Sequence, residues 1–107
     1  MNIEKILQEI EEISQNQFLP IIGPIKGQVL AELIVEKKPK KILEVGTLVG
    51  YSAMLMTLYM QKNAKIITIE KSKGLAKIAK RNIEKSGLAN RIKVVHGDAL
   101  EVIPKLS

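Results

Sequence analysis

The sequence predicts an α/β domain built on a parallel sheet. Three short apolar runs, Lys41–Val45, Lys65–Glu70 and Ile92–His96, have the length and β-branched content of buried strands. One segment of helical periodicity separates each run from the next. Strands joined in this way require right-handed crossovers and therefore pair in parallel. With 107 residues, 46% of them hydrophobic, the chain can form one domain with a core of its own.

Two helices and an apolar loop are predicted ahead of the sheet, within residues 1–38. Asn2 can cap the first helix, which ends near residues 14–17. Its apolar stripe consists of Ile3, Ile6, Leu7, Ile10 and Ile13.

The loop spans residues 18–24, FLPIIGP, in which two prolines and a glycine break any helix. Pro24 suits the opening of the second helix, Ile25–Glu36, and Pro39 follows its end. The expected apolar face of this helix comprises Val29, Leu30, Leu33 and Ile34.

Residues 39–107 are expected to form one βαβαβ unit. The helix over 51–60 is apolar nearly all round, and its methionines are typical of core residues that fill gaps. The helix over 72–86 begins at a serine cap and stops at Gly87. Its inward face is expected to hold Leu75, Ile78, Ala79 and Ile83, and residues 99–106 begin another helical turn.

Composition and charge narrow the class of protein. The net charge of +6 attracts anionic partners such as nucleic acid, but many lysines recur at helical spacing, which is typical of a solvated face. Nucleic acid is therefore a partner that we do not favour. The absence of cysteine fits a reducing compartment, and no apolar run approaches the ~20 residues that span a bilayer. We expect a cytoplasmic protein with no membrane partner.

A glycine turn follows the first predicted strand and leads into the helix over 51–60. Gly46 and Gly50 frame it, and Leu48 stands where a dinucleotide-binding motif would have its middle glycine. The turn also lacks the Lys-Ser or Lys-Thr ending of a P-loop. The amides that open the helix, at Tyr51 and Ser52, can donate to a carboxylate or a phosphate.

Acidic residues lie at the ends of all three predicted strands. Glu44 has the wrong charge for a diphosphate but suits an ammonium group, so that the turn matches a zwitterion such as the amino-acid end of S-adenosylmethionine (SAM). Glu70 can accept ribose hydroxyls, and Asp98 can accept from an adenine amino group. Each acid alone could merely cap a helix or face water. Together, at one edge of a parallel sheet, they favour a nucleoside.

Three stretches, ILEVGTLVGYSA, KIITIE and RIKVVHGDALEVIPKL, resemble successive motifs of the class I SAM-dependent methyltransferases. The Glu-x-Gly-Thr-x-x-Gly-Tyr-Ser form is similar to that of the catechol O-methyltransferase-like O-methyltransferases. The resemblance runs from about Pro20 to Leu106. It implies a partial Rossmann-like methyltransferase fold with strand order 3-2-1, and O-methyl transfer to a small hydroxylated substrate.

The resemblance also implies roles for particular residues. Glu44, Gly46 and Ser52 would hold the methionine end of SAM and Glu70 its ribose. Lys71 would pack its aliphatic stem against adenine, although a solvent-facing side chain fits equally well. The full set of implied cofactor-binding residues is Ile21, Ile22, Glu44, Gly46, Thr47, Gly50, Tyr51, Ser52, Glu70, Lys71, Asp98 and Ala99.

No catalytic or metal-binding residue is implied for this chain. In metal-dependent members of the family, acids and an amide after the fourth and fifth strands hold a divalent cation such as Mg²⁺, and the chain stops at Ser107, before those positions. Three explanations are open: a truncated O-methyltransferase, half of a split enzyme completed by another chain, or a non-catalytic binding module. An RNA-modifying methyltransferase is a further alternative.

The resemblance places Lys41–Val45 at the centre of a complete sheet. Without a fourth strand its outer edge would carry unpaired amides and carbonyls. We therefore expect this chain to form a homo-oligomer, or to bind a complementing chain, through residues 41–45.

Overall fold

The computed structural model describes residues 2–16, 21 and 23–106. Most of the predicted loop over 18–24, including Ile22, lies outside these residues. In chain order the elements are α1 (Ile3–Asn16), α2 (Gly23–Lys37), β1 (Lys41–Val45), α3 (Tyr51–Tyr59), β2 (Lys65–Glu70), α4 (Lys73–Lys85), β3 (Ile92–His96), α5 (Ala99–Val102) and a 3-10 turn, η1 (Ile103–Lys105).

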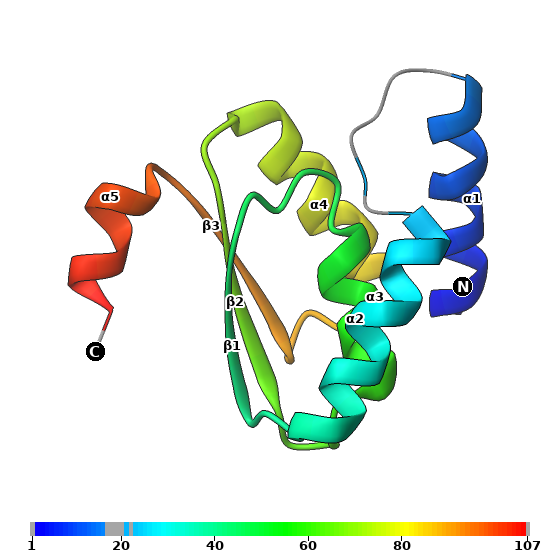
Figure 1. Cartoon of the computed structure of the whole chain (residues 1–107). Coiled ribbons are helices and arrows are strands. Elements are labelled where there is room, and N and C mark those ends of the chain that lie inside the picture. The colour runs from blue at the N-terminus through cyan, green and yellow to red at the C-terminus, as the bar shows by residue number, and fades with distance from the viewer. Residues whose placement is uncertain (1, 17–20, 22, 107) are drawn as a thin grey trace.

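The three strands form one parallel sheet in the order β1-β2-β3, which is the predicted order. The α1, α2, α3 and α4 helices lie on one side of this sheet, and the short α5 lies on the other (Figure 1). The predicted α/β fold and the bounds of all three strands are confirmed. Much of the second sheet face is therefore bare in the described part of the chain.

The register places like residues side by side on the covered face. Ile42 pairs with Ile66, and Ile66 pairs with Ile92. One step further along, Glu44 pairs with Thr68, so that a carboxylate and a hydroxyl lie on the same face. This polar pair sits inside an otherwise apolar layer, near the end of the sheet from which the glycine turn leaves.

Aliphatic residues and methionines make up the core between the sheet and the helices. Met54 is 0% exposed, and Met56 and Met60 are also buried, which confirms that these side chains fill the core. Asn2 caps α1 by accepting from the amide of Lys5 at 2.8 Å, as predicted. The predicted helix stop at Gly87 also holds, because its φ of 75° is in the left-handed region that favours glycine.

Some predicted inward residues instead face solvent. In α2, Val29 and Leu33 are exposed, whereas Gly27, Ala31 and Ile34 are buried. The reason is a close approach of α2 to α3, in which a Cβ on Gly27 would lie 2.6 Å from Leu55 Cδ2. Small residues, rather than the largest ones, make this contact.

The same correction applies to two other helices. Ile13 of α1 is 50% exposed, although Ile6, Leu7 and Ile10 are buried. Ile78 of α4 is also exposed, because α4 rests on a face that is built from alanines and Ile83. Apolar periodicity alone therefore located these helices but did not give the width of their buried face.

Strand β1 is less buried than a central strand would be. Within the described residues it pairs with β2 alone. Leu43 is 47% exposed and Val45 61%, because both point to the bare face of the sheet.

Replacing Met54 by alanine should lower the free energy of unfolding by about 2–5 kcal/mol, because it leaves a cavity at a fully buried position. Chemical denaturation followed by circular dichroism measures this change. The matched control is Ile78→Ala, at an exposed helix position, which should change stability by no more than about 0.5 kcal/mol. Equal effects of the two substitutions would contradict the packing described.

Candidate functional site

The glycine turn joins β1 to α3 through three residues with positive φ. Gly46 and Gly50 have φ values of 90° and 89°, and Leu48, between them, has a φ of 53°. The amide of Gly46 donates to the carbonyl of Ile69 at 2.8 Å, which ties the turn to β2. A left-handed conformation is costly for leucine, and such strained residues cluster at functional sites.

The start of α3 offers backbone donors. Gly50 is its N-cap residue and supplies no side-chain hydrogen bond, and the first bond of the helix runs from the amide of Met54 to the carbonyl of Gly50. The amides of Tyr51 and Ser52 therefore have no partner within the helix. A Cβ built on Gly46 would meet nothing within 4 Å, so there is open space beside the turn. This combination suits a small anionic group.

Glu44 lies at the centre of a hydroxyl network next to the turn. Its Oε2 accepts from Ser52 Oγ, and its Oε1 accepts from Thr68 Oγ1 at 2.6 Å. Thr68 Oγ1 lies 2.7 Å from Thr47 Oγ1, and since Thr68 has one hydroxyl proton, Thr47 is the donor in that contact. Burial raises the pKa of Glu44 above its ordinary value of 4.5, and the hydrogen bonds from Ser52 and Thr68 oppose this rise.

Glu70, at the end of β2, is 6% exposed and holds two loops at once. Its Oε1 accepts from the amide of Leu48 at 2.7 Å, and its Oε2 accepts from the amide of Ser72 at 2.8 Å. Each carboxylate oxygen has two lone pairs, so that each can accept one further hydrogen bond. The predicted ribose role thus remains a prediction, added to a structural role that the sequence analysis missed.

The third acid, Asp98, follows β3 and caps α5. Its Oδ1 accepts from the amide of Leu100 at 2.9 Å, and Ala99, half-buried, is the first residue of that helix. The carbonyl of Glu70 accepts from the amide of Gly97 at 2.9 Å. The ends of β2 and β3 are thereby joined, and the two acids lie at neighbouring strand ends.

The remaining predicted site residues are more scattered. Ile21 is half-buried against the core, Ile22 lies outside the described residues, and Lys71 is exposed. The Tyr51 side chain is buried and its hydroxyl donates to Glu11 of α1. Burial, followed by the hydrogen bond and negative charge of Glu11, raises the pKa of Tyr51. Only the backbone amide of Tyr51 is therefore available as a donor at the turn.

Two residues that hold the site together were not predicted. Thr68 is fully buried on the same sheet face as Glu44, and Asn82 of α4 donates through Nδ2 to the carbonyl of Val49 at 2.8 Å. A threonine at the middle of KIITIE is a usable signal, because a polar residue inside a buried strand needs a partner. The distant Asn82 gives no such signal.

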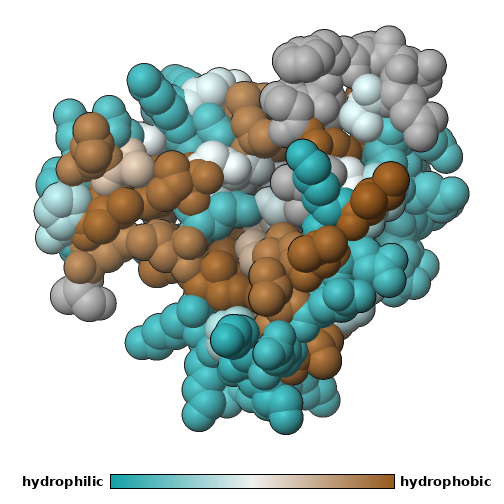
Figure 2. Space-filling view, in the orientation of Figure 1, coloured by the Kyte–Doolittle hydropathy of each residue, from teal (hydrophilic) through white to brown (hydrophobic). Residues whose placement is uncertain are grey.

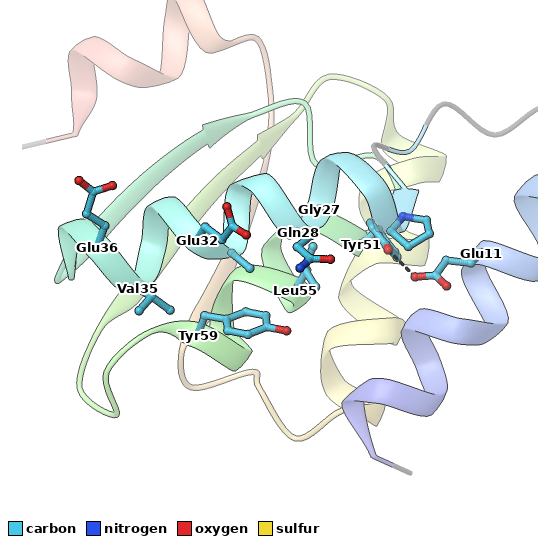
Figure 3. A pocket seen from close by; sticks show the side chains of 11 residues that line it. Glu11, Gly27, Gln28, Glu32, Val35, Glu36, Tyr51, Leu55 and Tyr59 are labelled. Atoms are coloured by element: carbon cyan, nitrogen blue, oxygen red, sulfur yellow. Dashed lines mark hydrogen bonds between the residues drawn. The ribbon is translucent and has the colours of Figure 1, made fainter.

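Two hollows in the described part of the chain lie away from the turn. One, of about 610 Å³, runs between α2 and α3; in Figure 3 Tyr51 and Glu11 close one end of it, and Tyr59 and Val35 lie farther along. The other, of about 850 Å³, lies on the bare sheet face near the start of the strands. We place the candidate site at the turn because the donors and acids gather there.

Metal binding finds no support in the described residues, in which no three His, Cys, Asp or Glu side chains form a group suited to a metal ion. The described residues therefore offer no group of ligands that would hold a divalent cation.

Comparison with known proteins gives a consistent result. A family model described as O-methyltransferase matches residues 2–107. Catechol O-methyltransferase from Niastella koreensis is 35% identical over 85 residues, which are 79% of this chain and 38% of that protein.

Solved structures agree with this match. An O-methyltransferase from Bacillus cereus in complex with SAH has a TM-score of 0.80 and 30% identity, over 96% of this chain and 46% of that chain. An O-methyltransferase from Streptomyces achromogenes in complex with SAM has a TM-score of 0.83 and 25% identity, over 95% and 47%. The chain thus spans less than half the length of these relatives.

The carboxyl of Glu44 should titrate above 4.5 in the folded protein, because its burial disfavours the charged form. Between 4.5 and the raised pKa the folded state binds more protons than the unfolded state, so the free energy of unfolding should fall as the pH rises through that interval. Carbon-13 NMR of the Glu44 carboxyl, with unfolding curves at each pH, measures both effects.

A pair of serine variants tests the cause. Ser52→Ala removes a hydrogen bond that lowers the pKa of Glu44 and should therefore raise that pKa further. Ser86→Ala is the control, since the hydroxyl of Ser86 donates to the carbonyl of Ile83. A Glu44 pKa at or below 4.5, or a fall in this pKa in Ser52→Ala, would show that the network is misassigned.

Proposed function

The chain belongs to the O-methyltransferase family, and on that premise we propose that its glycine turn binds SAM for methyl transfer to a small hydroxylated substrate. The family resemblance inferred from the motifs is confirmed. One observation carries the proposal. The amides at the start of α3 have no capping side chain and lie beside Glu44 near the end of β1, and Glu70 joins the turn after β1 to the end of β2. A zwitterion attached to a nucleoside fits this arrangement of charges.

The methionine end of SAM would bind at the turn. Its carboxylate would accept from the amides of Tyr51 and Ser52, where the positive end of the α3 dipole adds a favourable field. Its ammonium would face Glu44, and the close backbone approach would use the open space at Gly46. Thr47 and Gly50 maintain the turn, since Thr47 is buried in the Glu44 network and Gly50 has a φ of 89°.

The nucleoside would lie across the ends of β2 and β3. The free lone pairs of Glu70 would accept from the ribose hydroxyls, and Asp98 with Ala99 would border the adenine. The stem of exposed Lys71 would cover one face of the base. Ile21 and Ile22 would line the sulfonium side.

We assign this function to two parts of the chain. Residues 39–107 would carry the cofactor, and residues 1–38 would form a helical cover over α3. Among the described residues we assign no catalytic group, so that this chain's own contribution is to bind and orient the cofactor. Methyl transfer by the whole protein, and its hydroxylated substrate, rest on the family.

We also propose that the open edge of β1, residues 41–45, associates with another chain. The described residues provide no neighbouring strand for this edge, and unpaired amides and carbonyls favour strand addition.

Among the helices in the described part of the chain, none has the length and apolar character of a membrane span. The cytoplasmic location stays a prediction.

A second candidate, action on RNA, draws on the hollow on the bare sheet face. Its lining contains five basic residues and no acidic one, namely Lys40, Lys41, Lys65, Arg91 and Lys93. Such a surface attracts a polyanion by charge alone. The candidate therefore requires evidence of preference for RNA over other polyanions.

Isothermal titration calorimetry with SAM tests the main proposal, which expects saturable binding. Asp98→Ser should weaken binding about ten- to hundredfold, because it removes a carboxylate, while serine still caps α5. Glu70→Gln should weaken it as well, and circular dichroism reports whether the turn survives. Glu101→Gln, an exposed position on α5, is the control. Absence of binding at about 1 mM SAM refutes the cofactor site.

Fluorescence anisotropy with an RNA hairpin and with heparin distinguishes the second candidate. RNA recognition predicts tighter binding to RNA and a salt slope that becomes smaller by about one for each lysine removed. Lys93→Gln removes a lysine from the hollow, and Lys77→Gln removes one from α4 as its control. Equal affinity for the two polyanions would eliminate the RNA candidate.

A further inference from the structure

Two threonines are buried between the glycine turn and β2. Thr68 is 0% exposed and Thr47 is 1% exposed, so neither side chain can reach a ligand directly. In the described part of the chain, no buried side-chain polar atom lacks a hydrogen-bond partner. Any effect of these hydroxyls on the candidate site must therefore pass through the groups that they contact. Figure 2 shows the hydrophobic and hydrophilic surface around the molecule, from which these two residues are withdrawn.

The hydroxyl of Thr68 needs an explanation of its own. Its neighbours in β2 are Ile67 and Ile69, and a valine at this position would have the same shape with no polar group to satisfy. Threonine is branched at Cβ, which restricts χ1 and gives the hydroxyl a fixed direction. What this hydroxyl bonds to therefore accounts for a threonine in an apolar strand.

The hydroxyl of Thr68 lies between two oxygen atoms. Its Oγ1 is 2.6 Å from Glu44 Oε1 and 2.7 Å from Thr47 Oγ1. A charged carboxylate only accepts, so Thr68 donates its one proton to Glu44 and receives that of Thr47. Ser52 donates to the other oxygen of Glu44. Each carboxylate oxygen thus accepts one hydroxyl proton and keeps one lone pair for a further donor.

We propose that Thr68 is a positioning residue for the cofactor, which directs the Glu44 carboxylate so that its remaining lone pairs accept from the ammonium of SAM. This role rests on the function proposed above for the glycine turn. Glu44 and Thr68 are register partners on β1 and β2, which fixes the distance between their backbones. The carboxylate is therefore held from the sheet by Thr68 and from α3 by Ser52.

The same bonds divide the polar groups at the turn between the two charges of a zwitterion. The hydroxyl of Ser52 donates to Glu44, so that the amide of Ser52 is its donor for the ligand's carboxylate. The acceptors for the ammonium are the lone pairs of Glu44 that Thr68 and Ser52 leave free. A ligand that carries both charges on one carbon fits this division.

Hydroxyl donors, rather than a cation, compensate the charge of Glu44. Burial is the largest cause of its raised pKa, and the hydrogen bonds from Ser52 and Thr68 oppose the rise. No charged side chain of the described residues is among these causes. Glu70, the acid at the end of the adjoining strand, accepts from two backbone amides and shares no donor with Glu44. Removing the hydroxyl of Thr68 should therefore act on Glu44 directly.

Carbon-13 NMR of the Glu44 carboxyl in the ligand-free chain tests this hydrogen bond. Thr68→Val keeps the shape of the side chain and should raise the pKa of Glu44, because it removes a donor to the charged form. Thr68→Ser, which restores a hydroxyl, should return the pKa toward that of the unmodified chain. Thr57→Val is the matched control, since this buried threonine donates to the carbonyl of Ala53 within α3 and should leave Glu44 unchanged.

Thr47→Val tests the direction of the hydrogen bonds. In this variant Thr68 still donates to Glu44, so the pKa of Glu44 should rise less than in Thr68→Val. Circular dichroism reports whether each variant keeps its fold. An equal or larger rise in Thr47→Val overturns the assigned direction and the positioning role with it.

A double-mutant cycle with SAM tests whether Thr68 acts through Glu44. Thr68→Val should weaken SAM binding about tenfold in calorimetry, and Thr68→Ser should restore most of the affinity. In a Glu44→Gln background the charge that meets the ammonium is already absent, so Thr68→Val should weaken binding no further. Equal losses in the two backgrounds, or an unchanged affinity in Thr68→Val, overturn the positioning role.

The two measurements distinguish this role from the proposed function. An unmodified chain that does not bind SAM overturns the cofactor site, and with it the ammonium as the partner of Glu44. The pKa measurement needs no ligand. A Glu44 pKa that is unchanged in Thr68→Val overturns the positioning role even where SAM binds.

Discussion

The hydrogen bonds that Glu44 accepts from Ser52 and Thr68 are the interaction on which the candidate site depends. A buried carboxylate is costly, and hydroxyl donors from two different elements offset part of that cost. Thr47 then donates to Thr68, so that the network returns to the turn itself. The end of β1, the middle of β2 and the start of α3 are thereby fixed relative to one another. The network therefore also fixes the direction in which the unpaired amides at the start of α3 point.

Glu70, at the end of the neighbouring strand β2, also joins two segments through its carboxylate. It accepts from amides in the β1–α3 turn and in the β2–α4 loop, so that two segments far apart in the sequence share one carboxylate. This shared acceptor ties the two loops to each other at this edge of the sheet. The residues that would contact a cofactor are thus the residues that build the edge, and the strain of a left-handed Leu48 is sustained by the hydrogen bond to its amide.

The strands and the converging acids were predictable from the sequence, because strand length and alternation with helices determine the topology. The hydrogen-bond partners were not predictable. The pairing of Glu44 with Thr68 requires the register of two strands, and no local pattern specifies that register. Likewise Asp98 could be located at a strand end, but its bond to the amide of Leu100 depends on the local geometry of α5.

The predicted buried face of α2 was wrong for Val29 and Leu33, for a different reason, whereas Ile34 is buried and Leu30 packs against the core as predicted. Periodicity identified its largest apolar residues, whereas contact with α3 selected its smallest, Gly27 and Ala31. A Cβ at Gly27 would lie 2.6 Å from Leu55 Cδ2, so that a larger residue there requires the Leu55 side chain to shift, and the absence of a side chain lets α2 approach α3 closely on this face. Val29, two residues further along, lies on the opposite side of the helix from Gly27 and is exposed. The close contact at Gly27 thus leaves Val29 and Leu33, two of the larger apolar side chains of the helix, exposed to solvent.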